Sequence, residues 1–404
     1  MVPTWGTFSN NKRKALHFLV PQKRIGYTIP NLLSFLLTLN VHPFTAACQF
    51  APKDTILSVL PYGSGNVHDT FRVTVGRVEE NQFLLQRLKA GIFQNLEEVM
   101  HNIRIFSEHA RNRLENSPLE LGRRWEIPRI LMTAEGSDLW KDGDGFRWRA
   151  FSWIDQARSF DAVQDLNQAG EIGWALGIFH NLIHDLPLET LFDTLEGFHV
   201  TPHYLRCYDR VLSQKPPGKS PELDFALLFV KDRRRIVAVL EEARNQGYLN
   251  LRPIHGDPKV NNVMIDTVSG QAVGLVDLDT VKPGLIHYDL GDCLRSSSNP
   301  LGEESEKWEA VCFKTELCRA VWEGYLDRAG EFLTDYDYAF MFEAVRLIAF
   351  ELGLRFLTDF LEGNVYFKTG HPRQNLIRAL VQFKLTQSIE EQEKEIRAIF
   401  RKPG

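Results

Sequence analysis

The chain has 404 residues, of which 44% are hydrophobic and 25% are charged. This amount of apolar material excludes wholesale disorder and suffices for two or three domains. The formal net charge is −5, from 47 basic and 52 acidic residues. Such a balance gives no broad positive surface, so we expect no nucleic-acid partner.

Cysteine content and hydropathy indicate the compartment. The five cysteines are an odd number without C-x-x-C spacing, which argues against a disulfide framework and fits a reducing cytosol. Residues 29–41, followed by Cys48, imitate a secretion signal, but polar residues interrupt them and the lead-in is long and irregular. No apolar stretch reaches the roughly 20 residues of a membrane helix. We therefore expect a cytoplasmic protein that does not enter a membrane.

The first part of the chain predicts a small, strand-rich lobe. Residues 1–43 lack periodicity and are expected to form a poorly ordered N-terminal extension outside the fold. Beyond them, alternating runs predict strands and one amphipathic run predicts a helix. The strands are expected at 56–60, 70–75, 83–87 and 147–154, and the helix at 96–113.

The composition becomes helical after Asp155. We expect helices at 169–182 and 223–245, with a β-rich segment at 263–279 between helical regions. The predicted fold class is therefore α+β with two lobes. A small lobe would span residues 44–155, and a larger helical lobe with an internal β-hairpin would span 156–404.

The segment from Ile254 to Asp266 carries the strongest chemical signal. Asp257 and Asn262 lie in a loop that precedes a predicted strand, and the hairpin that follows returns the chain to Asp277. The hairpin should therefore bring Asp277 beside Asn262. Two carboxylates and one amide would then converge on one point.

Phosphoryl transfer needs this set of groups. Asp257 is the candidate catalytic base that accepts a hydroxyl proton, and Asn262 and Asp277 are the candidate ligands of Mg²⁺. The spacing His-x-Asp-x-x-x-x-Asn is that of a kinase catalytic loop, with Asp277 in the place of the metal-binding Asp of D-F-G. Leu278 and Asp279 replace the Phe and Gly of that motif.

The small lobe offers a candidate nucleotide site. Gly63, Ser64 and Gly65 lie between two predicted strands, where backbone N–H groups cover phosphates in a kinase, although His68 replaces the third glycine of G-x-G-x-x-G. Arg87 ends the third strand, where a kinase carries its phosphate-binding Lys, and we expect it to bind phosphate.

Several features around the nucleotide site have more than one interpretation. Arg87 is alternatively a solvated cation at the end of a strand. Three glutamates of the following helix are candidate partners for it: Glu97, Glu98 and Glu108. The adenine is expected against residues 151–155.

Polar residues further along the chain have open roles. Asp289 and Asp292 follow the candidate site and are expected to hold its loops by hydrogen bonds, with a direct role as the alternative. Glu351, Arg355 and Asp359 repeat at helical spacing. They form either a salt-bridged face or part of the acceptor pocket.

The motif residues resemble the aminoglycoside phosphotransferase and choline kinase superfamily, and within it the N-acetylhexosamine 1-kinase group most closely. The resemblance runs from about residue 44 to the C-terminus and departs from that group at His255 and Gly256. The segments that carry it are 61–70, 85–88, 261–263, 276–284, 288–292 and 355–359.

The resemblance implies a protein-kinase-like fold that uses ATP and Mg²⁺. It implies a small-molecule acceptor, namely an amino sugar phosphorylated at its anomeric hydroxyl. In that case Asp257 would be the base, Asn262 and Asp277 the metal ligands, and Asp279 either a metal ligand or a neighbour of one. The alternatives are another acceptor, such as an aminoglycoside, choline, homoserine or another sugar, and a nucleotide-binding pseudokinase without catalysis.

Overall fold

The computed structural model describes residues 42–402 except 64–67, 77–79, 90 and 215–217. The chain divides into residues 1–42 and a compact unit from Pro43 to Gly404. Nearly all of the expected N-terminal extension, and also Ser64 and Gly65, lie outside the described residues. Within the described part of the chain, every helix is too short or too polar to cross a bilayer.

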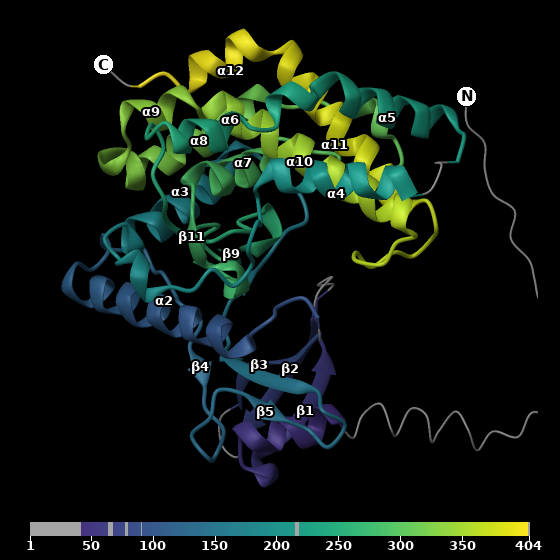
Figure 1. The fold of residues 1–404 in the computed structure, drawn as a ribbon. Coiled ribbons are helices and arrows are strands. Elements are labelled where there is room, and N and C mark those ends of the chain that lie inside the picture. Colours follow the sequence, from purple (N-terminus) through teal and green to yellow (C-terminus); the bar gives the residue numbers. More distant parts are fainter. Residues whose placement is uncertain (1–41, 64–67, 77–79, 90, 215–217, 403–404) are drawn as a thin grey trace, which may run out of the picture. The chain divides into compact units, whose positions relative to one another are not determined.

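The first lobe of the compact unit is an antiparallel sheet (Figure 1). Its strand order is β1-β2-β3-β6-β4, and β5 pairs with β6 at one end. The strands are β1 (Ile56–Pro61), β2 (Asp69–Gly76), β3 (Glu80–Leu88), β4 (Ile130–Leu131), β5 (Trp140–Lys141) and β6 (Arg147–Ser152).

Helix α2 (Leu96–Asn116) is a long helix of the first lobe. Asn95 caps it, because its side chain accepts the backbone N–H groups of Glu97 and Glu98. Its apolar residues recur at helical spacing and are buried, as Val99, Ile103 and Phe106 show. Phe106 stacks on Phe179 of the second lobe, so α2 belongs to the core that joins the lobes.

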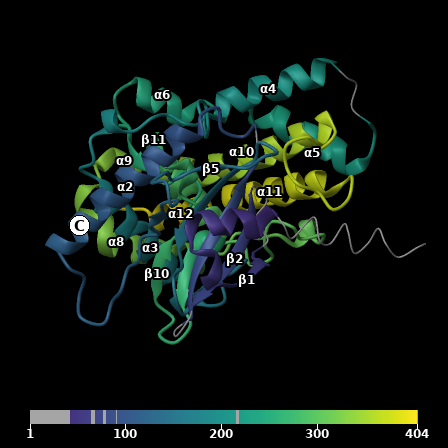
Figure 2. The same ribbon diagram turned by 90° about the horizontal axis from the view of Figure 1, so that it is seen from below.

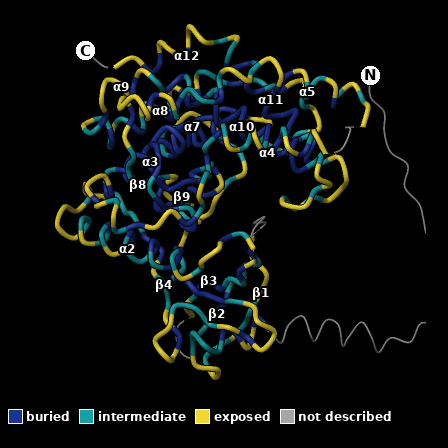
Figure 3. Tube along the Cα trace, viewed as in Figure 1, coloured by how far each residue is buried: buried dark blue, intermediate teal, exposed yellow. Residues whose placement is uncertain are grey.

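The second lobe is mostly helical. Helices α10 and α11 lie side by side in both ribbon views (Figures 1 and 2). Buried residues concentrate in α3, α7, α10 and α11, which form the centre of the lobe (Figure 3). The helices are α3 (Leu166–Ile183), α4 (Thr201–Gln214), α5 (Pro221–Arg233), α6 (Val239–Asn245), α7 (Ile286–Ser297), α8 (Thr315–Ala329), α9 (Asp335–Ala339), α10 (Met341–Glu362), α11 (Gln374–Glu391) and α12 (Glu393–Ile399).

Helices α3 and α8 pack with their backbones in direct contact. A Cβ atom at Gly173 would lie 1.8 Å from the carbonyl oxygen of Val321, and one at Gly324 would lie 2.1 Å from that of Gly170. Glycine normally weakens a helix. Here it permits the close approach, so the packing of α3 against α8 requires glycine at Gly173.

Two small sheets lie inside the second lobe and position the candidate site. Strand β8 (Arg252–Ile254) pairs with β11 (Lys282–Gly284). Strands β9 (Val263–Asp266) and β10 (Ala272–Leu275) form a hairpin, and β7 (Ala157–Arg158) pairs with β9. The chain therefore enters the second lobe directly after β6.

These features confirm the predicted α+β class with a β-rich first lobe and a helical second lobe. The single helix predicted at 223–245 is wrong. The chain breaks it into α5, a 3-10 turn at Arg234–Ile236 and α6. Because α5 packs on α11 and α6 packs on α10, tertiary contacts with two different helices override the continuous helical pattern.

Candidate active site

The catalytic loop lies between the two small sheets. Pairing of β8 with β11 places Ile254 opposite Lys282, and so brings the two loop ends together. In the β9–β10 hairpin, Val263 lies opposite Leu275, and the Val276 N–H donates to the carbonyl oxygen of Asn262 at 2.9 Å. The hairpin therefore places Asp277 next to Asn262, as the sequence predicts.

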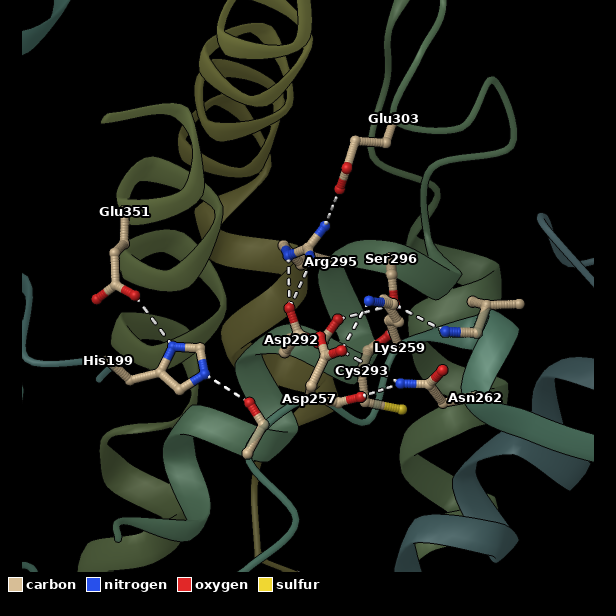
Figure 4. A network of polar contacts seen from close by, with 12 residues as sticks. His199, Asp257, Lys259, Asn262, Asp292, Cys293, Arg295, Ser296, Glu303 and Glu351 are labelled. Carbon is tan, nitrogen blue, oxygen red and sulfur yellow. Dashed lines mark hydrogen bonds and ion pairs between the residues drawn. The ribbon is translucent and has the colours of Figure 1, made fainter. Parts of the chain in front are cut away.

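Asp257 accepts hydrogen bonds from two neighbours in this loop (Figure 4). Its Oδ2 accepts from Lys259 Nζ at 2.7 Å and from Asn262 Nδ2 at 3.3 Å, and Nδ2 also donates to the Asp257 carbonyl at 2.7 Å. Burial raises the pKa of Asp257, but the Lys259 ammonium outweighs burial and lowers the pKa below its usual value. The carboxylate is therefore ionised near neutral pH and available as a base.

The backbone before Asp257 is held by buried side chains. Asp289 accepts the N–H of His255 at 2.7 Å and the N–H of Gly256 at 2.8 Å, while His180 contacts the same carboxylate. Gly256 has a φ of 88°, and a Cβ there would lie 2.6 Å from the Thr280 carbonyl oxygen. This position therefore requires glycine. Asp289 has the loop-holding geometry that the sequence predicts.

His199 holds the loop from the opposite side. Its Nε2 donates to the Gly256 carbonyl at 2.7 Å, and its Nδ1 donates to Glu351 Oε1 at 3.0 Å. Thr201 donates to the other oxygen of Glu351 at 2.7 Å. Burial lowers the pKa of His199, but the Glu351 carboxylate and other neighbours outweigh burial and raise the pKa above its usual value. Each ring nitrogen faces an acceptor oxygen, an arrangement that suits the protonated imidazole. The sequence does not reveal this pair. Glu351 belongs to the polar repeat 351–359, but His199 lies 152 positions away and stands in no motif.

Asp277 is suited to a cation. Burial raises its pKa, and the neighbouring Asp279 and Asp257 raise it further. A divalent ion would relieve this concentration of negative charge. In the described part of the chain, three or more Asp, Glu, His or Cys side chains do not gather into a metal cluster. One carboxylate and one amide nevertheless fit Mg²⁺, which takes its remaining ligands from phosphates and water.

A cavity extends from Asp277 to the sheet of the first lobe. Its apolar part includes Phe151 and Ile154, within the segment expected to hold adenine, and Asp277 and Asp279 lie at its polar end. The complete lining consists of Tyr62, Leu84, Gln86, Pro128, Arg149, Phe151, Ser152, Trp153, Ile154, Ser159, Met264, Val276, Asp277, Leu278 and Asp279.

Arg87 does not line this cavity. Side chains alternate along β3, so Leu84 and Gln86 face the cavity while Arg87 faces the other side of the sheet. There its guanidinium pairs with Asp69 at 2.6 Å and lies over the Phe146 ring.

The other expected nucleotide contacts are only partly described. Glu97, a candidate partner of Arg87, instead pairs with Arg147. The acidic partner of Arg87 is therefore Asp69 and not a glutamate of α2. Gly63 follows β1 with a φ of 74°, and Ser64 and Gly65 lie outside the described residues.

Arg149 is a cation of the cavity that the sequence analysis missed. It stands opposite Gln86 on the neighbouring strand and donates to Gln86 Oε1 at 2.9 Å. Its Nη2 donates to Asp279 Oδ2 at 2.8 Å. The strand register that brings Arg149 here appears in no short motif.

Helix α10 supplies the side of the site beyond Asp257. Arg355 lies among the rings of Phe198, Tyr204 and Phe367, each within 5.6 Å of its guanidinium carbon. Burial lowers the pKa of Arg355, but surrounding groups, Asp257 among them, outweigh burial and raise it. Arg355 is therefore a cation within electrostatic reach of Asp257.

Asp359 orders the segment that borders Arg355. Its carboxylate accepts the backbone N–H groups of Val365, Tyr366 and Phe367 at 2.8–3.0 Å. The members of the polar repeat of α10 thus differ in their contacts. Glu351 supports the candidate catalytic loop through His199, Arg355 lies among aromatic rings, and Asp359 fixes a neighbouring turn.

A strand-rich lobe, a helical lobe and a catalytic loop between them define the class of kinase-like phosphotransferases. Residues 58–331 match the phosphotransferase enzyme family, APH. Because this match covers more than half of the chain, the protein belongs to that family.

Solved structures of low sequence identity share the fold. A microcompartment-associated aminopropanol kinase superposes with a TM-score of 0.59 at 14% identity, over 90% of this chain and 99% of the other. An aminoglycoside phosphotransferase from Alicyclobacillus acidocaldarius gives 0.57 at 16% identity, over 89% and 95%. Amicoumacin kinase hAmiN, solved with AMP-PNP, Ca²⁺ and Ami, gives 0.54 at 14% identity, over 90% and 96%.

Proposed function

We propose that this phosphotransferase moves the γ-phosphoryl group of ATP to a hydroxyl of a small, uncharged sugar. The N-acetylhexosamines are the best candidates, with the anomeric hydroxyl as the acceptor. The nucleotide would occupy the cavity between the lobes. Its adenine would lie against Phe151 and Ile154, and its phosphates would extend toward Asp277.

Asp257 would orient the acceptor hydroxyl and take its proton as the oxygen attacks phosphorus. Its pKa is held low, so it is in the charged form that accepts a hydrogen bond from a hydroxyl. Lys259 lies 2.7 Å from the same carboxylate. Its ammonium is also placed to face the negative charge of the transferring group.

Asn262 and Asp277 would hold Mg²⁺ by one oxygen each. When bound, the ion would neutralise charge on the β- and γ-phosphates. The Asn262 amide nitrogen donates to Asp257, which fixes the amide and orients its oxygen away from the base. Base and metal ligand are therefore tied together within one loop.

Arg355 is the observation that favours an uncharged acceptor. Aminoglycosides, choline and amino alcohols are cations, and a guanidinium within electrostatic reach of the base would repel them. In the described part of the chain, Arg355 forms no ion pair, and Glu351 is already neutralised by His199. The aromatic rings around Arg355 are occupied by its own guanidinium, so they are not free to cage a quaternary ammonium.

The resemblance of several segments to N-acetylhexosamine 1-kinases supports the same acceptor. Arg355 belongs to one of those segments, residues 355–359, and donates up to five hydrogen bonds. Sugar hydroxyls and an acetamido carbonyl are the uncharged acceptors that such a donor set suits.

An acceptor panel tests the proposal. The purified protein is incubated with ATP, Mg²⁺ and N-acetylglucosamine, N-acetylgalactosamine, kanamycin, choline or homoserine. We expect an anomeric phosphate with phosphorus–H1 coupling in the NMR spectrum of the N-acetylhexosamine products. Phosphate only on kanamycin, choline or homoserine would reject the sugar assignment. ATP binding without turnover on any acceptor would support the pseudokinase alternative.

Arg355→Met provides a second test of the acceptor. We expect a rise in KM for the sugar and a gain in relative activity toward cationic acceptors. Arg346→Met is the matched control, because Arg346 lies on the same helix and pairs with Glu343. Unchanged acceptor preference in Arg355→Met would contradict the electrostatic argument.

A further inference from the structure

Asp279 lies two residues beyond the proposed metal ligand Asp277, in the 3-10 turn Leu278–Thr280. It is 5% exposed. From sequence it is either a second metal ligand or a neighbour of one. Its contacts distinguish these roles.

Both oxygens of Asp279 face cationic or hydrogen-bonding groups of the first lobe. Arg149 Nη1 lies 2.6 Å from Oδ1, and Arg149 Nη2 donates to Oδ2 at 2.8 Å. His68 Nε2 donates to Oδ2 at 2.8 Å. His68 Nδ1 accepts the backbone N–H of Lys89 at 3.2 Å, so the ring proton resides on Nε2. Oδ1 of Asp279 is thus ion-paired with Arg149, and Oδ2 accepts two hydrogen bonds.

We propose that Asp279 is a positioning residue rather than a metal ligand, and that Arg149 and His68 hold the metal-binding turn through it. This inference rests on the proposed function, because it concerns the metal site of that function. The three side chains are here called the interlobe clamp. Arg149 comes from β6, His68 from the segment before β2, and Asp279 from the second lobe.

The backbone at Asp277 explains why the turn needs to be held. Asp277 has a φ of 66° and a ψ of 57°, the left-handed region that residues other than glycine rarely adopt. Such a conformation persists only where the surroundings enforce it. The hairpin bond from Val276 to Asn262 fixes one side of Asp277, and the interlobe clamp fixes the other.

The clamp also couples the two lobes. In a kinase, the phosphate-binding cation pairs with a glutamate inside the small lobe. Here Arg149 reaches across to the turn that carries the metal ligand, and its Nη1 lies 3.8 Å from Met100 Sδ on α2. One buried ion pair therefore joins the first lobe to the turn that carries the proposed metal ligand.

Arg149→Met tests the inference by the sign of its effect on metal binding. The affinity of Mn²⁺ is measured by electron paramagnetic resonance in the presence of a non-hydrolysable ATP analogue. Simple electrostatics predicts tighter Mn²⁺ binding when a positive charge is removed. Loss of positioning predicts the opposite, and we expect Mn²⁺ to bind about 10- to 100-fold more weakly.

His68→Leu is the second variant, and it keeps the test decisive if Arg149→Met does not fold. His68 donates to Asp279 without being a ligand candidate itself, so a smaller loss of Mn²⁺ affinity is expected. Arg147→Met is the matched control. Arg147 lies on the same strand and pairs with Glu97 inside the first lobe, so Mn²⁺ affinity should not change.

The double variant Arg149→Met/Asp279→Asn separates the two roles of Asp279. If the residues act as one clamp, the double variant loses no more Mn²⁺ affinity than Arg149→Met alone. Additional loss of affinity in the double variant, or unchanged or tighter binding in Arg149→Met, would overturn the inference. A wild-type protein that binds no metal–nucleotide complex would instead refute the proposed function itself.

Discussion

Replacement of Asp257 by Asn removes the proposed base with little change in shape. In the wild type, Lys259 Nζ lies 2.7 Å from the carboxylate. The amide of the variant keeps an oxygen that can accept a hydrogen bond from Lys259, but it cannot take a proton from the acceptor hydroxyl. Loss of general-base catalysis is worth about 10²–10⁴ in rate. This corresponds to about 3–5 kcal/mol, at roughly 1.4 kcal/mol for each factor of ten.

Nucleotide binding should survive the Asp257→Asn change. Asn262 remains fixed, because its amide also donates to the backbone carbonyl of residue 257 at 2.7 Å, a bond that the substitution leaves in place. Asp277 is untouched. We therefore expect the Kd of Mg·ATP, measured by calorimetry, to stay within about threefold of wild type. A threefold change in Kd corresponds to a change of ~0.7 kcal/mol in binding free energy.

Asp277→Asn is the matched comparison, since it makes the same chemical change at the metal site. It should weaken Mg·ATP binding, because a neutral oxygen replaces a charged one. Turnover is measured by a coupled ADP assay for both variants. If Asp257→Asn retains more than a tenth of wild-type kcat, or loses nucleotide affinity as Asp277→Asn does, the assignment of Asp257 as base is wrong.

Three further predictions concern stability, measured by urea denaturation. Gly173→Ala should lower the free energy of unfolding by about 3 kcal/mol, because the new Cβ would overlap the Val321 carbonyl of α8. Gly170→Ala on the same helix is the control and should leave stability unchanged, so equal effects would contradict the packing argument. Burial lowers the pKa of His287 to about 4, below the unfolded value of about 6.5. The free energy of unfolding of the wild type should therefore fall by up to about 3 kcal/mol as the pH drops from 6.5 to 4, and that of His287→Gln should fall by correspondingly less. Glu351→Gln should lower the free energy of unfolding by about 3–5 kcal/mol, because it leaves the buried His199 without its charged partner. The loss should be larger at pH 5 than at pH 8, because Glu351 raises the pKa of His199 and its removal makes protonation of the imidazole unfavourable. A loss that does not depend on pH would argue that the pair is not charged.

The local parts of the site could be predicted from sequence because they follow one another along the chain. The three candidate residues, Asp257, Asn262 and Asp277, lie within a segment of 21 residues. The sequence also predicts the hairpin that joins them, because its turn residues are recognisable. The β1, β2 and β3 strands were equally accessible, since alternation along a strand is a local signal. Their boundaries in the structure extend the predicted ones by one to three residues.

The cation of the cavity could not be predicted in this way. Arg87 and Arg149 both lie on strands next to a candidate cavity, and only the register decides which faces inward. Arg149 stands opposite Gln86, one position from Arg87, and the side-chain period of two then puts Arg87 on the other face. A shift of one residue would reverse the assignment, and no single-strand pattern contains that information.

Long-range pairs were equally inaccessible. His199 and Glu351 are separated by 152 positions, and His199 lies in a turn before α4 and stands in no motif. Their role in holding the loop becomes apparent only when the fold places His199 against the Gly256 carbonyl. The same holds for His68 and Asp279, which are 211 positions apart.

We propose that helix α10 connects support of the candidate base with choice of the acceptor. Glu351 and Arg355 lie four residues apart, so they occupy successive turns on one face. Glu351 acts through His199 on the carbonyl of Gly256, directly before the candidate base, whereas Arg355 lies among aromatic rings. A substitution at 355 can therefore change the preferred acceptor while the base keeps its position. A substitution at 351 disturbs the base whatever acceptor is bound, and this asymmetry distinguishes a specificity residue from a positioning one on the same helix.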